Sequence, residues 1–153
     1  MNLELEIAEI LRNDSVMMSI LIGNVYTEEE IGVEGIRRGE DSPTALAFDD
    51  RGVLLPCAVV RHHSPFPVDG VVDEAEGIMS VRQITSIFYY QFRGHAIVDS
   101  AKDRGYSILQ GTKLENTNKL VFLFETDAIP DMGPVANSTV LRQDWDAVYV
   151  RRR

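Results

Sequence analysis

Three histidines are the side chains in this sequence best suited to bind a metal ion or to act as a general base: His62, His63 and His95. His62 and His63 are adjacent, and adjacent residues on a strand point to opposite faces, so the pair does not readily converge on one metal ion. His95 lies far along the chain. We therefore expect no metal site and no other cofactor.

A nucleophile would have to come from serine or cysteine. Ser64 follows His63 directly, but sequence neighbours do not form a nucleophile–base pair, and the G-x-S-x-G turn of hydrolases does not occur in the sequence. Cys57 lies in the apolar stretch "VLLPCAVV", where no basic neighbour would lower its pKa, so we expect a buried structural thiol. The sequence thus offers no catalytic residue and predicts that the chain is not an enzyme.

Ligand-binding stretches are also weakly supported. The acidic segments "TEEE" and "DEAE" lack the spacing of a calcium loop, and "GVEGIRRGE" lacks the G-K-[ST] of a phosphate loop. The aromatic residues at 88–90 could stack on bases, but packing is the simpler role for aromatic residues on a half-buried strand. The net charge of −9 argues against general binding to nucleic acid, which needs a basic face.

The composition indicates the class of protein that must position these residues. The chain has 153 residues, of which 44% are apolar and 25% charged, as is ordinary for one globular domain. A single cysteine excludes an internal disulfide. No apolar run approaches the ~20 residues of a membrane span. The acidic, amphipathic start lacks the regions of a signal peptide, so we expect a cytoplasmic origin.

Helices are predicted at the start of the chain, followed by an irregular segment. Apolar residues recur at helical spacing from Leu3 to Leu11, and Asn13 or Asp14 can cap a second, short helix over "SVMMSILI". Residues 27–51 carry several glycines and mixed charges, so we expect a long loop or extended arm, with a short strand at "TALAFDD".

The middle of the chain favours strands. A strand is expected over 51–63, and Pro56 would place it at an edge or a bulge because proline lacks the ladder donor. Residues 64–77 are expected to form a polar connection. Residues 79–92 alternate as a half-buried antiparallel strand does, with the set that includes Ile84 as the more apolar one.

A helix from about His95 to Gln110 should pack on the sheet. The apolar run "KLVFLFE" predicts a central strand, and residues 138–153 predict a strand with a charged outer face opposite a face that includes Trp145. The order of elements predicts an α+β fold, a mainly antiparallel sheet with two helices packed on one face plus a long loop or arm. The core should contain Ile84, Phe88, Ile97, Ala101, Ile108, Val121 and Leu123.

Two stretches carry a resemblance to a known family. "ILRNDSVMMSILIGNVY" resembles the opening of the tail-terminator and tail-completion proteins of long-tailed bacteriophages, in which a first helix, an acidic turn, a short apolar helix and a glycine lead into a strand. "ITSIFYYQFRGHAIVDSAKDRGYSILQG" resembles the central strand and second helix of that family. The resemblance covers residues 1–26 and 81–124, and it implies a single domain over 1–153 with an inserted arm or loop at about 27–51.

The resemblance implies a structural virion protein. Members of this family form a homo-oligomeric ring, typically of six copies, that ends the tail tube and joins it to the head connector. Its partners would be further copies of itself, the tail tube protein and the connector or stopper proteins, and DNA would pass through the channel without specific binding. There would be no membrane partner. The protein would lie in the virion tail or neck after assembly in the cytoplasm of the bacterial host.

Candidate contacts between subunits are charged. Glu34, Arg37 and Arg38 lie in the irregular segment, and Arg151, Arg152 and Arg153 end the chain, where an acidic neighbour could pair with them. Two alternatives remain open at this point: another head–tail connector or tail-tube component, or a small cytoplasmic α+β enzyme or ligand-binding domain.

Overall fold

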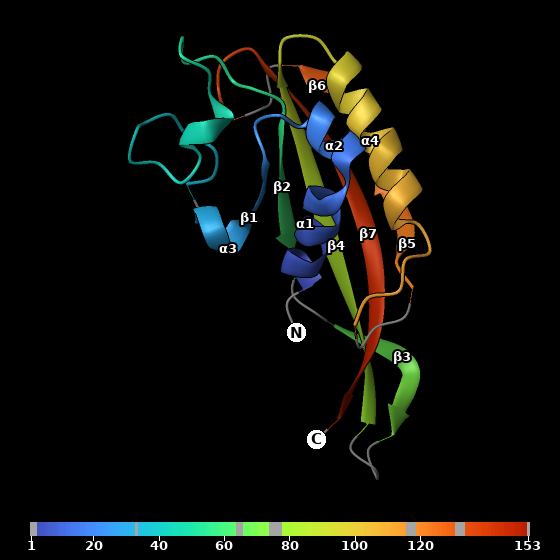
Figure 1. Cartoon of the computed structure of the whole chain (residues 1–153). Helices are drawn as coiled ribbons and strands as arrows, with labels where there is room; N and C mark the ends of the chain where they lie inside the picture. Colours follow the sequence, from blue (N-terminus) through green and yellow to red (C-terminus); the bar gives the residue numbers. More distant parts are fainter. Residues whose placement is uncertain are drawn as a thin grey trace.

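A seven-stranded sheet organises the fold, with three helices on one of its faces (Figure 1). The computed structural model describes residues 3–32, 34–63, 66–73, 78–115, 119–130 and 134–152, without the side chains of 66–73, 78–81 and 148–152. The elements are α1 (Leu3–Asn13), α2 (Ser15–Ile20), β1 (Val25–Thr27), α3 (Glu28–Ile31), the 3-10 turn η1 (Ala45–Ala47), β2 (Cys57–His62), β3 (Phe66–Asp73), β4 (Ile78–Phe92), α4 (Ala96–Leu109), β5 (Val121–Glu125), β6 (Ile129–Pro130) and β7 (Ser138–Arg152).

The strands follow the order β1-β2-β4-β7-β5, with β3 also paired to β4 and β6 to β7. β1 and β2 are parallel, and the other described pairs are antiparallel. β4 and β7, each 15 residues long, pair along their whole length, from Ile78 opposite Arg152 to Phe92 opposite Ser138. The predicted α+β class with a mainly antiparallel sheet is confirmed.

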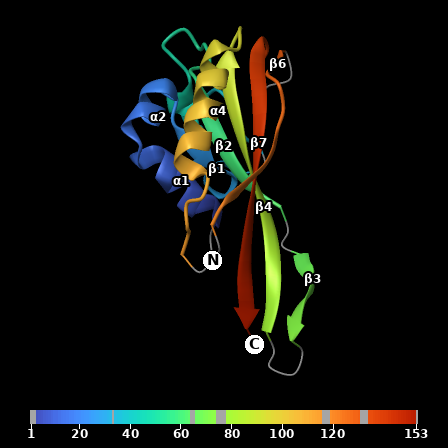
Figure 2. The ribbon, with the colours of Figure 1, turned by 90° about the vertical axis from the view of Figure 1, so that its right-hand side faces the viewer.

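A three-stranded ribbon extends away from the helices. β2 pairs with residues 85–90 of β4, and β3 continues on the same side of β4, from Phe66 opposite Arg82 to Asp73 opposite Ile78. We call β3, with Ile78–Arg82 of β4 and Val148–Arg152 of β7, the arm. It is distinct from the arm or loop predicted at about 27–51. Figures 1 and 2 both show it projecting from the body, with the C-terminal end of the chain at its far end.

The expected polar connection over 64–77 is therefore wrong, because residues 66–73 form β3. Proline and glycine in this stretch suggested a loop. The register between β3 and β4 shifts between Pro67 and Val72, and such a bulge accommodates residues that fit poorly into a regular ladder.

The main core lies between the sheet and helices α1, α2 and α4 (Figure 2). On β7 the predicted inward face is confirmed, since Leu141, Gln143 and Trp145 are fully buried. On β4 the predicted inward set is wrong. Ile87 and Tyr89 face the helices, together with polar Gln83, Thr85 and Gln91.

The predicted burial of three other residues is wrong as well. Ile97 is 38% exposed, and the neighbouring Val98 is buried in its place. Val121 and Leu123 are 51% and 41% exposed, because β5 lies at the edge of the sheet and not at its centre. The predicted burial of Ala101 is confirmed.

A hydrogen-bonded group inside the core fixes how closely α4 approaches the sheet. Gln143 Oε1 accepts from Tyr89 Oη at 3.0 Å and from Trp145 Nε1 at 3.1 Å, and Gln143 Nε2 donates to the carbonyl of Lys102 in α4 at 3.0 Å. Gly105 lies directly above this group. A Cβ there would overlap Tyr89 Oη and come within 3.0 Å of Gln143 Oε1.

The opposite face of the sheet is covered in part by the segment between β1 and β2. Ile31, Ile36, Ala47 and Leu54 of this segment pack in a second cluster, together with residues of β1, β2 and β4 that include Tyr90. The short strand predicted at "TALAFDD" is wrong, because residues 45–47 form η1.

Buried Thr44 holds the two halves of this segment together. Its hydroxyl accepts from Arg37 N at 2.9 Å and donates to Arg37 O at 2.8 Å.

Pro56 precedes β2, which lies between β1 and β4, so the predicted edge position of that strand is also wrong.

Asp14 links the start of α2 to α4. As predicted, it caps α2, accepting from Met17 N at 2.8 Å. Its carboxylate also accepts two bonds from Arg104 in α4, at 2.8 and 2.7 Å. The hydrogen bond from Arg104 lowers the pKa of Asp14 below its ordinary value of 3.8.

Gly105→Ala should destabilise the protein, although alanine favours a helix over glycine by about 1 kcal/mol. The added methyl group overlaps Tyr89 Oη, and overpacking of this kind costs about 1–3 kcal/mol. Chemical unfolding of the single and double variants measures the effect. Tyr89→Phe removes the obstructing hydroxyl, so Gly105→Ala should cost less in that background, and an equal cost in both backgrounds would contradict the packing described.

Asp14→Ala should lower the free energy of unfolding by about 1–2 kcal/mol through loss of the cap. Asp14→Asn keeps a capping oxygen and should cost less. Because the folded pKa is depressed, the carboxylate stabilises the protein above pH 3.8, and this contribution is lost as the pH falls through the folded pKa. Unfolding curves of wild type and Asp14→Asn should therefore converge below pH 3.8, and a constant difference there would argue against the ion pair.

Candidate subunit interface

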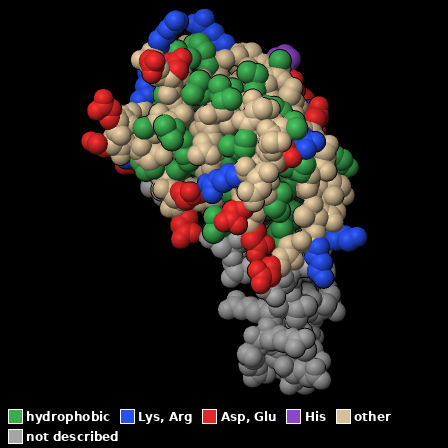
Figure 3. All heavy atoms as spheres, viewed as in Figure 1, with side chains coloured by type: hydrophobic (Ala, Val, Ile, Leu, Met, Phe, Trp, Pro, Cys, Tyr) green, Lys and Arg blue, Asp and Glu red, His purple; other side chains and the backbone are tan. Residues whose placement is uncertain are grey.

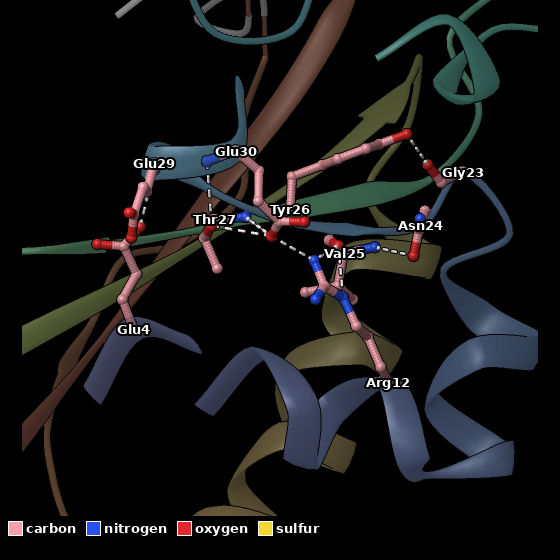
Figure 4. A network of polar contacts seen from close by, with 9 residues as sticks. All are labelled: Glu4, Arg12, Gly23, Asn24, Val25, Tyr26, Thr27, Glu29 and Glu30. Atoms are coloured by element: carbon pink, nitrogen blue, oxygen red, sulfur yellow. Dashed lines mark hydrogen bonds and ion pairs between the residues drawn. The ribbon is translucent and has the colours of Figure 1, made fainter. Parts of the chain in front are cut away.

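The outer edge of β1 is closed by side chains (Figure 4). Arg12 donates to the Val25 carbonyl from Nε and Nη2, at 3.0 and 2.7 Å, and Asn24 Oδ1 accepts from Val25 N at 2.8 Å. Glu30 Oε1 accepts from Thr27 N at 3.0 Å. Because these backbone groups already have partners, a further strand cannot readily add at this edge.

Arg12 and Glu30 also hold each other in place. Arg12 Nη2 donates to Glu30 Oε1 at 2.6 Å, and Thr27 and Glu30 form a capping box at the start of α3. Burial raises the pKa of Glu30, but the hydrogen bonds from Arg12 and Thr27 outweigh this and lower its pKa below 4.5. Glu30 thus stays ionised at neutral pH and keeps the edge closed.

At the opposite edge, the chain that leads into β5 occupies backbone groups at the start of the strand. Leu120 N donates to Thr112 O at 2.8 Å, and Leu120 O accepts from Gly111 N at 2.9 Å. Phe122 N donates to the side chain of Gln110 at 2.8 Å. Both edges of the body thus have backbone groups occupied by residues of the same chain.

Apolar side chains are nevertheless exposed along β5 and β6. We call Val121, Leu123, Phe124 and Ile129 the edge patch, and they are 51%, 41%, 53% and 40% exposed. On the face that bears the helices, exposed hydrophobic side chains lie in separate places among charged and other side chains (Figure 3). A row of exposed apolar side chains on an edge strand is a typical contact surface.

A second apolar surface lies between the end of α2 and the start of α4. It is a groove of about 360 Å³ whose lining includes Ile20, Ile22, Pro56 and Ile97. The edge patch and this groove are different surfaces of one subunit.

The part of the sheet face beyond the second cluster is charged. Arg82 forms two hydrogen bonds to Asp146, at 2.8 and 2.6 Å, and Arg142 forms two to Asp144, at 2.8 and 3.0 Å. The guanidinium of Arg142 also lies over the ring of Phe88, 5.7 Å from its centroid. These arginines are neutralised within the subunit.

This face brings a serine, a histidine and an aspartate together, but not in the order of a catalytic triad. Ser86 Oγ donates to Asp144 at 2.7 Å and lies 2.9 Å from His63 Nε2. In a triad the histidine lies between the other two and takes the proton of the serine. Here the serine lies between them, so the geometry does not activate it as a nucleophile.

The predicted contact residues fall in two places. Glu34 and Arg37 form an exposed ion pair at 2.9 Å, and Arg38 lies over the Phe48 ring at 5.7 Å from its centroid. Arg151 and Arg152 end β7 in the arm, and Arg153 lies outside the described residues. The role of all six in subunit contacts stays a prediction.

The histidines lie in three separate surroundings. His62 pairs with buried Glu4, His63 lies beside Ser86, and His95 pairs with Asp99 at 2.8 Å. Within the described ranges, no three histidine, cysteine or acidic residues are grouped as metal ligands. Cys57 is buried as predicted, and burial raises its pKa to about 12.

Sequence reasoning did not identify the closed edges or the edge patch. The apolar run at β5 was visible in the sequence, but it suggested burial.

Among the described helices, none is long and apolar enough to cross a membrane.

Comparison with known proteins gives a likeness of fold. A chain from the virion of a native gene transfer agent particle superposes with a TM-score of 0.64 and 16% sequence identity, over 97% of this chain and 95% of that chain. No family model and no curated protein sequence matches this chain. At this level of identity the likeness shows that the two chains share a fold along nearly their whole length.

Arg12→Ala should lower the free energy of unfolding by about 1.5–3 kcal/mol, because the Val25 carbonyl and Glu30 lose charge-assisted hydrogen bonds. Arg37→Ala is the matched control, since its ion pair with Glu34 is exposed and should contribute less than about 1 kcal/mol. Urea unfolding measures both. Equal, small effects would show that Arg12 is not needed to close the edge.

Proposed function

We propose that the chain is a structural subunit of a phage-like virion, a tail-terminator or neck protein that forms a ring, ends the tail tube and joins it to the head connector. The observation that carries the proposal is the likeness of fold over nearly the full length of both chains to a component of a gene transfer agent virion. The likeness of residues 1–26 and 81–124 to tail terminators supports the same role.

The surface of the subunit suits assembly. Occupied backbone groups at β1 and β5 disfavour strand addition at those places on the body, while the edge patch leaves apolar area for a defined contact. The arm reaches beyond the body, where it can meet a neighbour (Figure 2). In such a ring, of about six copies, the remaining partners are the tail tube and the connector or stopper proteins.

DNA passes through the ring without specific binding. Arg82 and Arg142 are paired with Asp146 and Asp144, and the net charge is −9, so the chain offers phosphate little attraction. The segment 27–51, with Glu34, Arg37 and Arg38, contributes a further contact between subunits. The protein lies in the virion neck and assembles in the host cytoplasm.

The purified chain should form closed rings with a central hole, visible by negative-stain imaging, and its mass by light scattering should rise with concentration to a fixed multiple. Leu123→Ser with Phe124→Ser should weaken assembly with a small effect on the thermal midpoint, because the two side chains are 41% and 53% exposed. Leu5→Ser with Val16→Ser, which are exposed apolar residues of α1 and α2, is the matched control.

A wild-type chain that stays monomeric at every concentration would contradict the proposal. If rings do form, labelling of the chain in complete particles tests where in the particle it lies. A signal at the head–tail junction supports the neck position, and a signal along the tail would indicate the alternative, a tail-tube component.

A further inference from the structure

Within the part of the chain that the structure describes, each outer strand of the arm has a strand partner on one side alone. Pairing of β5 with β7 ends at Val121 opposite Asp146, so residues 147–152 of β7 have a strand partner on the β4 side alone within the described residues. β3 is paired with β4 at residues 66–67 and 72–73, with a register shift between them, and forms the other edge of the arm. Open edges present free backbone donors and acceptors, which favour the addition of another strand.

The two edges carry opposite charge. The sequence of β3, "FPVDGVVD", contains Asp69 and Asp73 and no lysine or arginine. The last described residues of β7, "VYVRR", contain Arg151 and Arg152 and no acidic residue. Because β4 lies between them, β3 and β7 are not neighbours within one arm. Each edge is therefore available to a different molecule.

Charge of this kind selects which edges can meet. Like charges opposite each other on neighbouring strands are destabilising, and opposite charges are stabilising. Two β3 edges, or two β7 edges, would repel each other, whereas a β3 edge and a β7 edge attract. Head-to-tail contact is thus favoured over symmetric pairing of two arms.

We propose that the arms of neighbouring copies lie edge to edge, with the β7 edge of one copy against the β3 edge of the next. The occupant of each open edge is a second copy of this chain. Each copy uses two different surfaces, so the contact repeats in one direction and closes when the rotation between copies fits a ring. The inference rests on the self-assembly that the proposed function requires, and adds the surfaces and their polarity.

Charge reversal of each edge tests the contact. Asp69→Arg with Asp73→Arg makes the β3 edge basic, and Arg151→Glu with Arg152→Glu makes the β7 edge acidic. Each variant alone should associate at least about tenfold more weakly than wild type, because like charges then face each other. Glu9→Arg with Glu115→Arg changes the net charge by the same amount as the β3 variant, at exposed residues of the body, and should associate as wild type does.

Mixing the two reversed variants gives the decisive measurement. In an alternating ring every contact again joins an acidic and a basic edge, so the mixture should assemble although neither variant does so alone. Restoration in trans also shows that both variants are folded. The neutral variants Asp69→Asn with Asp73→Asn, and Arg151→Gln with Arg152→Gln, should reduce the salt dependence of assembly, since they remove charges that salt screens.

The outcomes separate this inference from the proposed function. If wild type forms rings but the reversed variants assemble equally well, or if their mixture is not restored, the edge-to-edge contact is wrong and the ring-forming role stands. If wild type does not assemble at any concentration, the proposed function fails and this inference fails with it. Restoration in the mixture, with an unaffected body control, supports both.

Discussion

The antiparallel pairing of β4 with β7 is the interaction on which the rest of the structure depends. Fifteen residues of each strand are in register without interruption, so both strands run from the packed body into the arm. Side chains alternate between the two faces of a strand. The register between β4 and β7 therefore fixes which residues of each strand lie under the helices. A shift of β7 by one residue along β4 would move Trp145 out of the core beneath the helices and bring Asp144 and Asp146 under them.

Polar contacts inside the core then make the packing specific. Gln143 accepts hydrogen bonds from Tyr89 and Trp145 on the sheet and donates to the backbone of α4, so the helix has one favourable position above it. Gly105 leaves the space that this position requires. A fully apolar core would hold the helix with less dependence on its exact placement.

Local signals in the sequence were sufficient for part of the fold. The spacing of apolar residues predicts α1, a cap at Asn13 or Asp14 predicts the start of α2, and the alternation along β7 predicts its inward face. The inward face of β4 could not be predicted in the same way. Both of its faces are covered, and the side under the helices carries polar residues that find partners, such as Gln91, which caps α4 through Val98 N.

Features that depend on contacts between distant residues were not predictable. Nothing near Arg12 in the sequence indicates that it closes an edge formed by Val25, or that Glu30 assists it. The position of β5 follows from the strand order, which the apolar run alone does not encode. The candidate contacts at the end of β7 were predicted from their charge, but the open edge beside them is visible in the fold alone.

The continuity of β4 and β7 has a mechanical consequence. Each strand passes from the arm to the core without a hinge, so a force applied to the arm is carried directly into the ladder beneath α4. Sliding of one strand past the other is disfavoured, because a shift of one residue would move the side chains of the slipped strand to the other face of the sheet. The subunit should therefore respond to a pull on its arm by bending or by transmitting the load, and not by gradual slippage.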